Sequence, residues 1–137
     1  MEKIEGYLDY YCKEKGYNCA KTVLRAANDA WGLNLDESVY LSMGGFGGGM
    51  ATRNVCGAIS GGIAAMGYLY MDETGYESPL MMAKVKLLME LVKERLGDEK
   101  CSFLEPKFKT SEEGCVPTIH VVSKIIDEVV ATDIEVE

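Results

Sequence analysis

The chain has 137 residues, enough for one domain with a substantial hydrophobic core, because the buried fraction of the surface rises with chain length. Its 22 acidic and 14 basic residues give a formal net charge of −8, which repels the phosphates of nucleic acids and anionic lipid head groups. We therefore expect neither nucleic acid as a partner nor insertion into a membrane. The first residues lack the basic-then-apolar profile of a secretory signal, so we expect a cytoplasmic protein.

Apolar residues recur at steps of three and four along most of the chain, which is the spacing that lines one face of a helix. Asn18 and the pair Ser78-Pro79 are typical helix starts, and Gly32 and Gly97 are typical helix ends. In chain order, this pattern predicts helices over residues 2–15, 19–31, 37–43, 55–70, 79–96 and 115–130.

The segments between these helices show no strand-like alternation, no repeat and no domain boundary. Residues 72–78 are predicted to form a loop, and residues 101–113, which contain Pro106 and many charges, a short turn followed by a loop. The sequence therefore predicts an all-α fold, a compact bundle of about five or six helices in a single domain over residues 1–137.

The most apolar stretch, Val55–Met71, is shorter than the roughly 20 residues needed to span a bilayer and is interrupted by four glycines. We expect a buried core helix. Gly57, Gly61 and Ala65 share one stripe of this helix, which favours close packing of a neighbouring helix. A bound cofactor or a partner subunit would also explain it, and a homodimer is left open.

Four of the five cysteines fall at the start of a predicted helix or, for Cys101, of a predicted turn, where free N–H groups and the helix dipole lower the pKa of a thiol. These are Cys19, Cys56, Cys101 and Cys115. No Cys-x-x-Cys pair is present, so neither a thioredoxin-like motif nor a zinc ribbon is indicated, and tertiary packing must bring the four together. Cys12, near the end of the first helix, is interpreted as structural.

The run Met43–Met50 contains five glycines, so its backbone can approach a ligand closely and direct N–H groups at it. It lacks the Gly-Lys-Ser/Thr ending of a phosphate-binding loop, and a plain flexible turn is the alternative. We expect the run to lie against the cysteines. The candidate cofactor-contacting residues are Gly45, Gly47, Gly48, Gly49 and Gly57.

The only histidine, His120, follows Cys115 by five residues, so on a helix the two side chains are rotated by about 140 degrees. We predict that they do not face one site. A cysteine-histidine hydrolase mechanism then lacks its usual base.

Three sequence motifs resemble those of a family of small redox-active proteins named for the pattern C, GCAxxG, C and C. They are Tyr17-Asn18-Cys19-Ala20, Gly45-Phe46-Gly47-Gly48-Gly49-Met50 and Val55-Cys56-Gly57-Ala58-Ile59-Ser60-Gly61, followed by the isolated Cys101 and Cys115. The order Cys-Gly-Ala departs from a literal reading of the family name but keeps the spacing of a CGAxxG motif. The resemblance implies an all-helical fold and a redox role for these four cysteines, whereas Cys12 has no counterpart in the pattern.

Two hypotheses follow for Cys19, Cys56, Cys101 and Cys115. In the first, they are the catalytic thiols of an oxidoreductase or electron carrier with an unidentified redox partner, and they either bind an iron-sulfur cluster or cycle between dithiol and disulfide. In the second, they are the ligands of a structural zinc ion in a metal-binding or protein-interaction module. All-thiolate ligation suits both metals. Either hypothesis predicts that the four converge on one region and that Cys12 stands apart.

Overall fold

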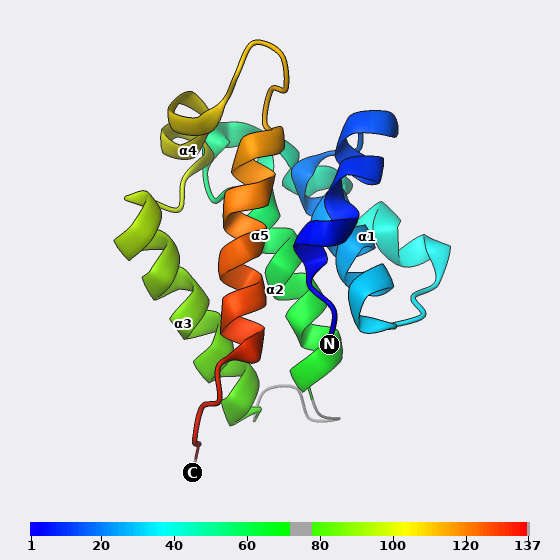
Figure 1. Ribbon diagram of the computed structural model, residues 1–137, viewed down its shortest axis with the longest axis vertical. Coiled ribbons are helices and arrows are strands. Elements are labelled where there is room, and N and C mark those ends of the chain that lie inside the picture. Colours follow the sequence, from blue (N-terminus) through cyan, green and yellow to red (C-terminus); the bar gives the residue numbers. More distant parts are fainter. Residues whose placement is uncertain (72–77, 137) are drawn as a thin grey trace.

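Helices make up nearly all the regular structure of residues 1–71 and 78–136, the parts of the chain that the computed structural model describes (Figure 1). The elements, in chain order, are η1 (Ile4–Tyr7), η2 (Tyr10–Glu14), α1 (Cys19–Trp31), η3 (Glu37–Phe46), η4 (Gly49–Arg53), α2 (Gly57–Tyr70), α3 (Pro79–Leu96), α4 (Cys101–Phe108) and α5 (Val116–Ala131). The prediction of an all-α, single-domain fold is confirmed. The loop predicted over residues 72–78 lies almost entirely outside the described residues.

The start and end signals of the main helices act largely as predicted. The Asn18 side chain accepts a hydrogen bond from the Lys21 amide at 2.7 Å, and Gly32 ends α1 in a left-handed conformation with φ of 64°. Ser78 precedes α3 as predicted, but its hydroxyl donates to the Tyr70 carbonyl at 2.6 Å instead of capping the helix. The α3 helix is therefore linked to the end of α2.

Two segments differ from the sequence-based expectation. The helix predicted over residues 2–15 consists of a 3-10 turn and a π turn, and its start is fixed by tertiary bonds from the Ile4 and Glu5 amides to the Asp127 carboxylate. The segment predicted as a short turn and loop forms the two-turn helix α4. Pro106 removes one hydrogen bond close to the end of α4, and the complete burial of Leu104 favours the helix.

The α2 helix lies at the centre of the bundle, as expected for the most apolar stretch. A methyl group added at Gly61 would overlap the Ala20 carbonyl oxygen of α1, and one added at Gly62 would overlap the end of Ile126 in α5. The glycines therefore permit close helix packing, which was the leading explanation of their pattern. Among the described residues, no helix combines the length and apolar character needed to cross a bilayer.

The helix directions bring several helix starts to one end of the molecule. In Figure 1, α2 and α5 run from the upper end downwards, α3 runs upwards, and the short α4 lies at the upper end. An isolated antiparallel bridge between Val55 and Lys100 joins the residues just before α2 to those just before α4. This end contains the cysteines.

Candidate thiol site

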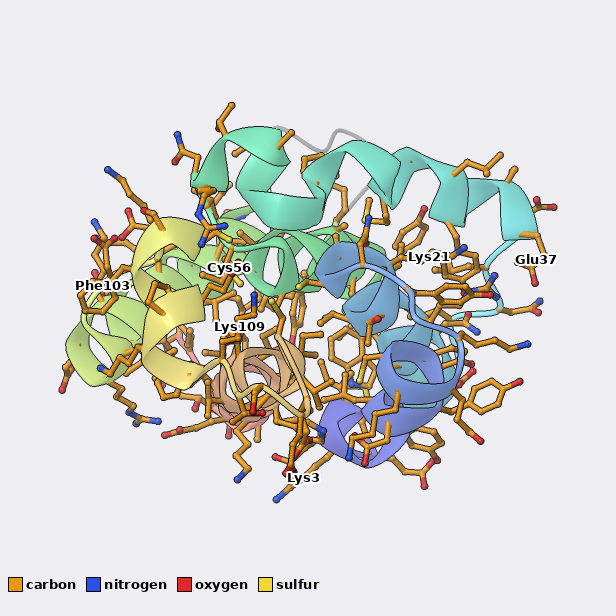
Figure 2. The ribbon with its side chains drawn as sticks, turned by 90° about the horizontal axis from the view of Figure 1, so that it is seen from above. Lys3, Lys21, Glu37, Cys56, Phe103 and Lys109 are labelled. Atoms are coloured by element: carbon orange, nitrogen blue, oxygen red, sulfur yellow. The ribbon has the colours of Figure 1, made fainter. Side chains whose placement is uncertain are left out.

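The four motif cysteines line one small pocket at this end of the bundle. Each lies at a helix start, as predicted for Cys19, Cys56 and Cys115: Cys19 and Cys101 are the first residues of α1 and α4, while Cys56 and Cys115 directly precede α2 and α5. Figure 2 looks onto this end, with Cys56 labelled. The pocket has a volume of about 40 Å³, and its lining consists of Cys19, Gly48, Gly49, Cys56, Gly57, Cys101, Leu104, Glu105, Cys115 and Thr118.

The cysteines differ in their access to solvent. Cys56 and Cys101 are buried, with 3% and 8% of their surface exposed. Cys19 and Cys115 are partly exposed, and both also line a neighbouring, more open pocket of about 280 Å³. A solute in this second pocket therefore reaches Cys19 and Cys115 directly, whereas Cys56 and Cys101 lie behind them.

Thiol ionisation divides the cysteines in the same way. The Cys19 and Cys115 thiols interact with each other, which is the main reason why the pKa of Cys115 is lowered to about 7 and that of Cys19 is raised. Burial raises the pKa of Cys56 to about 11 and also raises the pKa of Cys101. Cys115 is thus the one pocket cysteine whose pKa is lowered, and it ionises near neutral pH.

The expectation that a helix start lowers the thiol pKa is wrong for three of the four cysteines. Burial acts against the charged form of a thiol, and at Cys56 and Cys101 it outweighs the favourable effect of the helix end. At Cys115 the interaction with the thiol of Cys19 decides the direction of the pKa shift.

The glycine run contacts the site through its second half. Gly48 and Gly49 line the pocket, and both have left-handed backbone conformations with φ of 65° and 64°. A methyl group at Gly49 would lie 2.8 Å from the Cys101 Cβ atom, so the sulfur-bearing helix α4 approaches the backbone closely there. Gly57, also proposed as a contact, lines the pocket as well, whereas Gly45 and Gly47 are not among the lining residues.

Contrary to the prediction, Cys12 does not stand apart from the other cysteines. It is partly buried, lies outside the four-cysteine pocket, and lines the open pocket together with Cys19 and Cys115. The π turn of η2 and the chain reversal at Gly16 bring it to the start of α1. His120, by contrast, faces away as predicted, with its Nε2 atom 2.7 Å from Oδ1 of Asp9.

Sequence reasoning missed Glu105 and Thr118 as residues of the site. Thr118 lies in the first turn of α5 and lines the pocket beside Cys115. Glu105 follows Cys101 by one turn of α4, and its Oε2 accepts a hydrogen bond from the Cys101 sulfur at 3.6 Å. The spacing of four would have indicated this contact only if residues 101–108 had been predicted as a helix.

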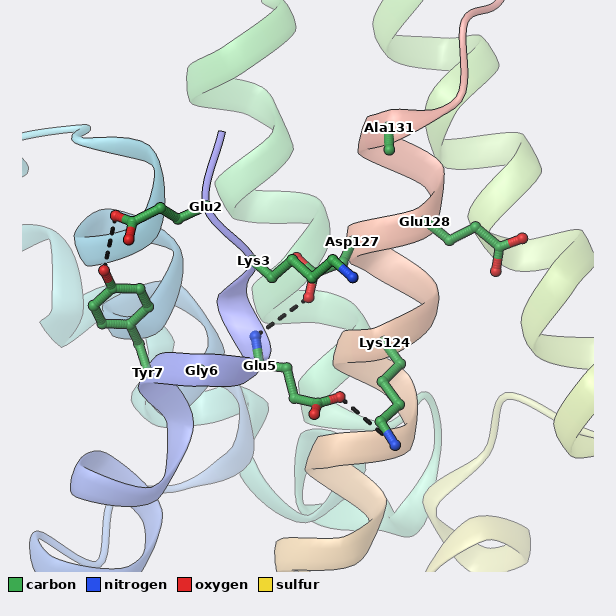
Figure 3. Close-up of a pocket in the computed structure, with 9 residues that line it drawn as sticks. All are labelled: Glu2, Lys3, Glu5, Gly6, Tyr7, Lys124, Asp127, Glu128 and Ala131. Carbon is green, nitrogen blue, oxygen red and sulfur yellow. Dashed lines mark hydrogen bonds and ion pairs between the residues drawn. The ribbon is translucent and has the colours of Figure 1, made fainter.

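A larger hollow lies away from the cysteines, in an open groove of about 800 Å³ between η1 and α5 (Figure 3). Most of its charged groups already have partners within the protein. The Asp127 carboxylate accepts hydrogen bonds from backbone amides of η1, and Lys124 pairs with Glu5 at 3.8 Å. These bonds across the groove attach the N-terminal segment to α5.

Comparison with known proteins adds one decisive match. Residues 17–129 match the model of the family described as "Putative redox-active protein (C_GCAxxG_C_C)". The chain belongs to this family. Within the match lie all four pocket cysteines, whereas Cys12 lies outside it. No curated protein and no solved structure matches the chain.

A family named for a redox role and a pattern of four cysteines raises the question of a bound metal. The donor set, four thiols around one pocket, has the right chemistry for zinc or an iron-sulfur cluster. The side-chain arrangement does not provide the ligand geometry: within residues 1–71 and 78–136, no three histidine, cysteine or acidic side chains are grouped to hold a metal ion. As the side chains stand, the pocket does not fit a metal.

Proposed function

We propose that this member of the redox-active family is a thiol-disulfide exchange protein in which Cys19 and Cys115 are the reacting pair. The observation that carries the proposal is that Cys19 and Cys115 line both the closed and the open pocket, and that their thiols interact at the boundary between the two. This interaction supplies a thiolate near neutral pH and a second thiol beside it.

The reaction follows from this pair. The Cys115 thiolate attacks one sulfur of a substrate disulfide, the substrate S–S bond breaks, and the leaving thiolate takes a proton from solvent. Cys19 then loses its proton and attacks the sulfur of Cys115 in the mixed disulfide, which releases the second substrate thiol. In total, one substrate disulfide becomes two thiols, while Cys19 and Cys115 become a disulfide.

The two buried cysteines, Cys56 and Cys101, would form a second pair that reacts more slowly because it is less accessible. The Cys56 amide donates to the Glu99 carbonyl at 2.9 Å, and the Cys101 amide donates to the Asn54 carbonyl at 2.6 Å, so the two backbones run side by side. A second dithiol behind the first would restore Cys19 and Cys115 by exchange within the protein.

The alternatives are metal-based. Four thiolates holding an iron-sulfur cluster would make the chain an electron carrier, and four holding zinc would make it a structural or interaction module. Both need the side chains to move together, because no three of the described ligand-type side chains are grouped for a metal.

One preparation separates these functions. Protein purified anaerobically is analysed for iron, zinc and visible absorption, and its thiols are counted before and after mild oxidation. The proposal predicts metal-free, colourless protein that loses two thiols reversibly. Visible charge-transfer absorption with bound iron would establish the cluster instead, and stoichiometric zinc the structural module.

A further inference from the structure

The carboxylate that sequence reasoning missed is built into the thiol pocket. Glu105 is partly buried, with 17% of its side chain exposed, and its two oxygens are shared among three groups. Oε2 accepts from the Cys101 sulfur at 3.6 Å and pairs with Arg53 at 3.2 Å, while Oε1 pairs with Lys109 at 3.2 Å. Cys101 and Glu105 lie one turn apart on α4, and Lys109 directly follows the helix.

We propose that Glu105 is a positioning residue that keeps the proton on Cys101, so that Cys101 does not compete with Cys115 as the attacking thiolate. The carboxylate holds the S–H of Cys101 in a hydrogen bond, and its negative charge opposes a second negative charge on the adjacent sulfur. Arg53 and Lys109 keep the carboxylate itself ionised, so the effect persists across the neutral range. This inference rests on the proposed function, in which Cys115 attacks first.

The charged groups around Cys101 shift its pKa in opposite directions. After burial, the charge of Glu105 is the largest contribution that raises the pKa of Cys101, and Arg53 on η4 lowers it. From the start of α5, Cys115 also raises it. Glu105 raises the pKa of Cys115 through charge alone, whereas at Cys101 it adds a direct hydrogen bond. Removing Glu105 should therefore affect Cys101 more than Cys115.

The test compares Glu105→Gln with the matched control Glu99→Gln. Glu99 is partly buried to the same extent, with 18% of its side chain exposed, and it pairs with Lys93 at 3.5 Å outside the pocket lining. The rate of alkylation of each cysteine by iodoacetamide is followed against pH, with the sites resolved by mass spectrometry. The midpoint of the Cys101 profile should fall in Glu105→Gln and stay in place in Glu99→Gln. Each unit of the fall raises the thiolate fraction of Cys101 at pH 7 about tenfold.

A second variant keeps the inference testable if Glu105→Gln does not fold. Arg53→Met retains most of the side-chain length of Arg53, a residue half exposed at the surface, and removes its positive charge. It should move the Cys101 midpoint upwards, opposite to Glu105→Gln. The inference is overturned if Glu105→Gln shifts the midpoint of the Cys101 profile no more than Glu99→Gln does. It is also overturned if Arg53→Met leaves that midpoint in place or lowers it. Because alkylation needs no disulfide, this result is independent of whether Cys19 and Cys115 form one.

Discussion

The substitution Cys19→Ala removes the thiol whose interaction lowers the pKa of Cys115. With Cys19 present, Cys115 has a pKa of about 7 and is half ionised at pH 7. Without it, burial and Glu105 still raise the pKa of Cys115, so even at the free-thiol pKa of about 8.5 it would be only about 3% ionised, roughly a 15-fold loss of thiolate. A thiolate of higher pKa is intrinsically more nucleophilic, by about 5-fold for this difference in exchange reactions. The net expectation is a roughly threefold slower reaction at pH 7.

The pH profile makes this prediction sharper than a single rate. Above about pH 9.5, Cys115 is ionised in both proteins, and Cys19→Ala should react about 5-fold faster because only the nucleophilicity term remains. The two curves therefore cross. The assay is the first phase of thiol release from a small coloured disulfide, measured by stopped flow from pH 5.5 to 10.5.

The same assay reports the second step through its stoichiometry. The unmodified protein should release two equivalents of probe thiol from the Cys115 site, because Cys19 resolves the mixed disulfide, and Cys19→Ala should release one. Cys12→Ala is the control, since Cys12 lies outside the four-cysteine pocket. Cys12→Ala should keep the midpoint of the rate-against-pH curve near pH 7. Rates that are unchanged at pH 7 in Cys19→Ala, with the same midpoint, would refute the reasoning.

Three further predictions concern the rest of the bundle. Because burial raises the pKa of Cys56 to about 11, this thiol should resist alkylation at pH 8 in the native protein and react readily in denaturant, as site-resolved labelling would show. Gly61→Ala should lower the free energy of unfolding by about 1–3 kcal/mol through overlap with Ala20. Gly67→Ala, in open space on the same helix, should leave the free energy of unfolding unchanged or raise it by up to about 1 kcal/mol. Chemical denaturation measures both variants. His120→Gln should leave the thiol exchange rates unchanged, since His120 contacts Asp9; a slower Cys115 reaction in this variant would place the imidazole in the mechanism.

Local signals made the fold and the placement of the cysteines predictable. Asn18 before Cys19, proline after Cys115 and the glycines of α2 act within a few residues, so the sequence alone indicates where those helices begin. The convergence of the cysteines followed from their shared position at helix starts together with the family resemblance.

The chemistry within the pocket depended on contacts that no local pattern encodes. Cys19 and Cys115 meet through the packing of α1 and α5, and only that contact identifies Cys115 as the thiolate. Glu105 was missed because Pro106 disfavours a helix locally, while the burial of Leu104 stabilises one. Cys12 was misplaced because the π turn of η2 changes its direction relative to a regular helix.

The central claim is that Cys19 and Cys115 form the reacting pair, and the identity of the first disulfide tests it most directly. Reduced protein is treated anaerobically with one equivalent of a small disulfide oxidant, blocked with an alkylating reagent, digested without reduction and mapped by mass spectrometry. We predict a peptide pair joined between Cys19 and Cys115, with Cys56 and Cys101 still alkylated as thiols after unfolding. A first disulfide that joins any other two cysteines, or that joins two protein molecules, would contradict the claim.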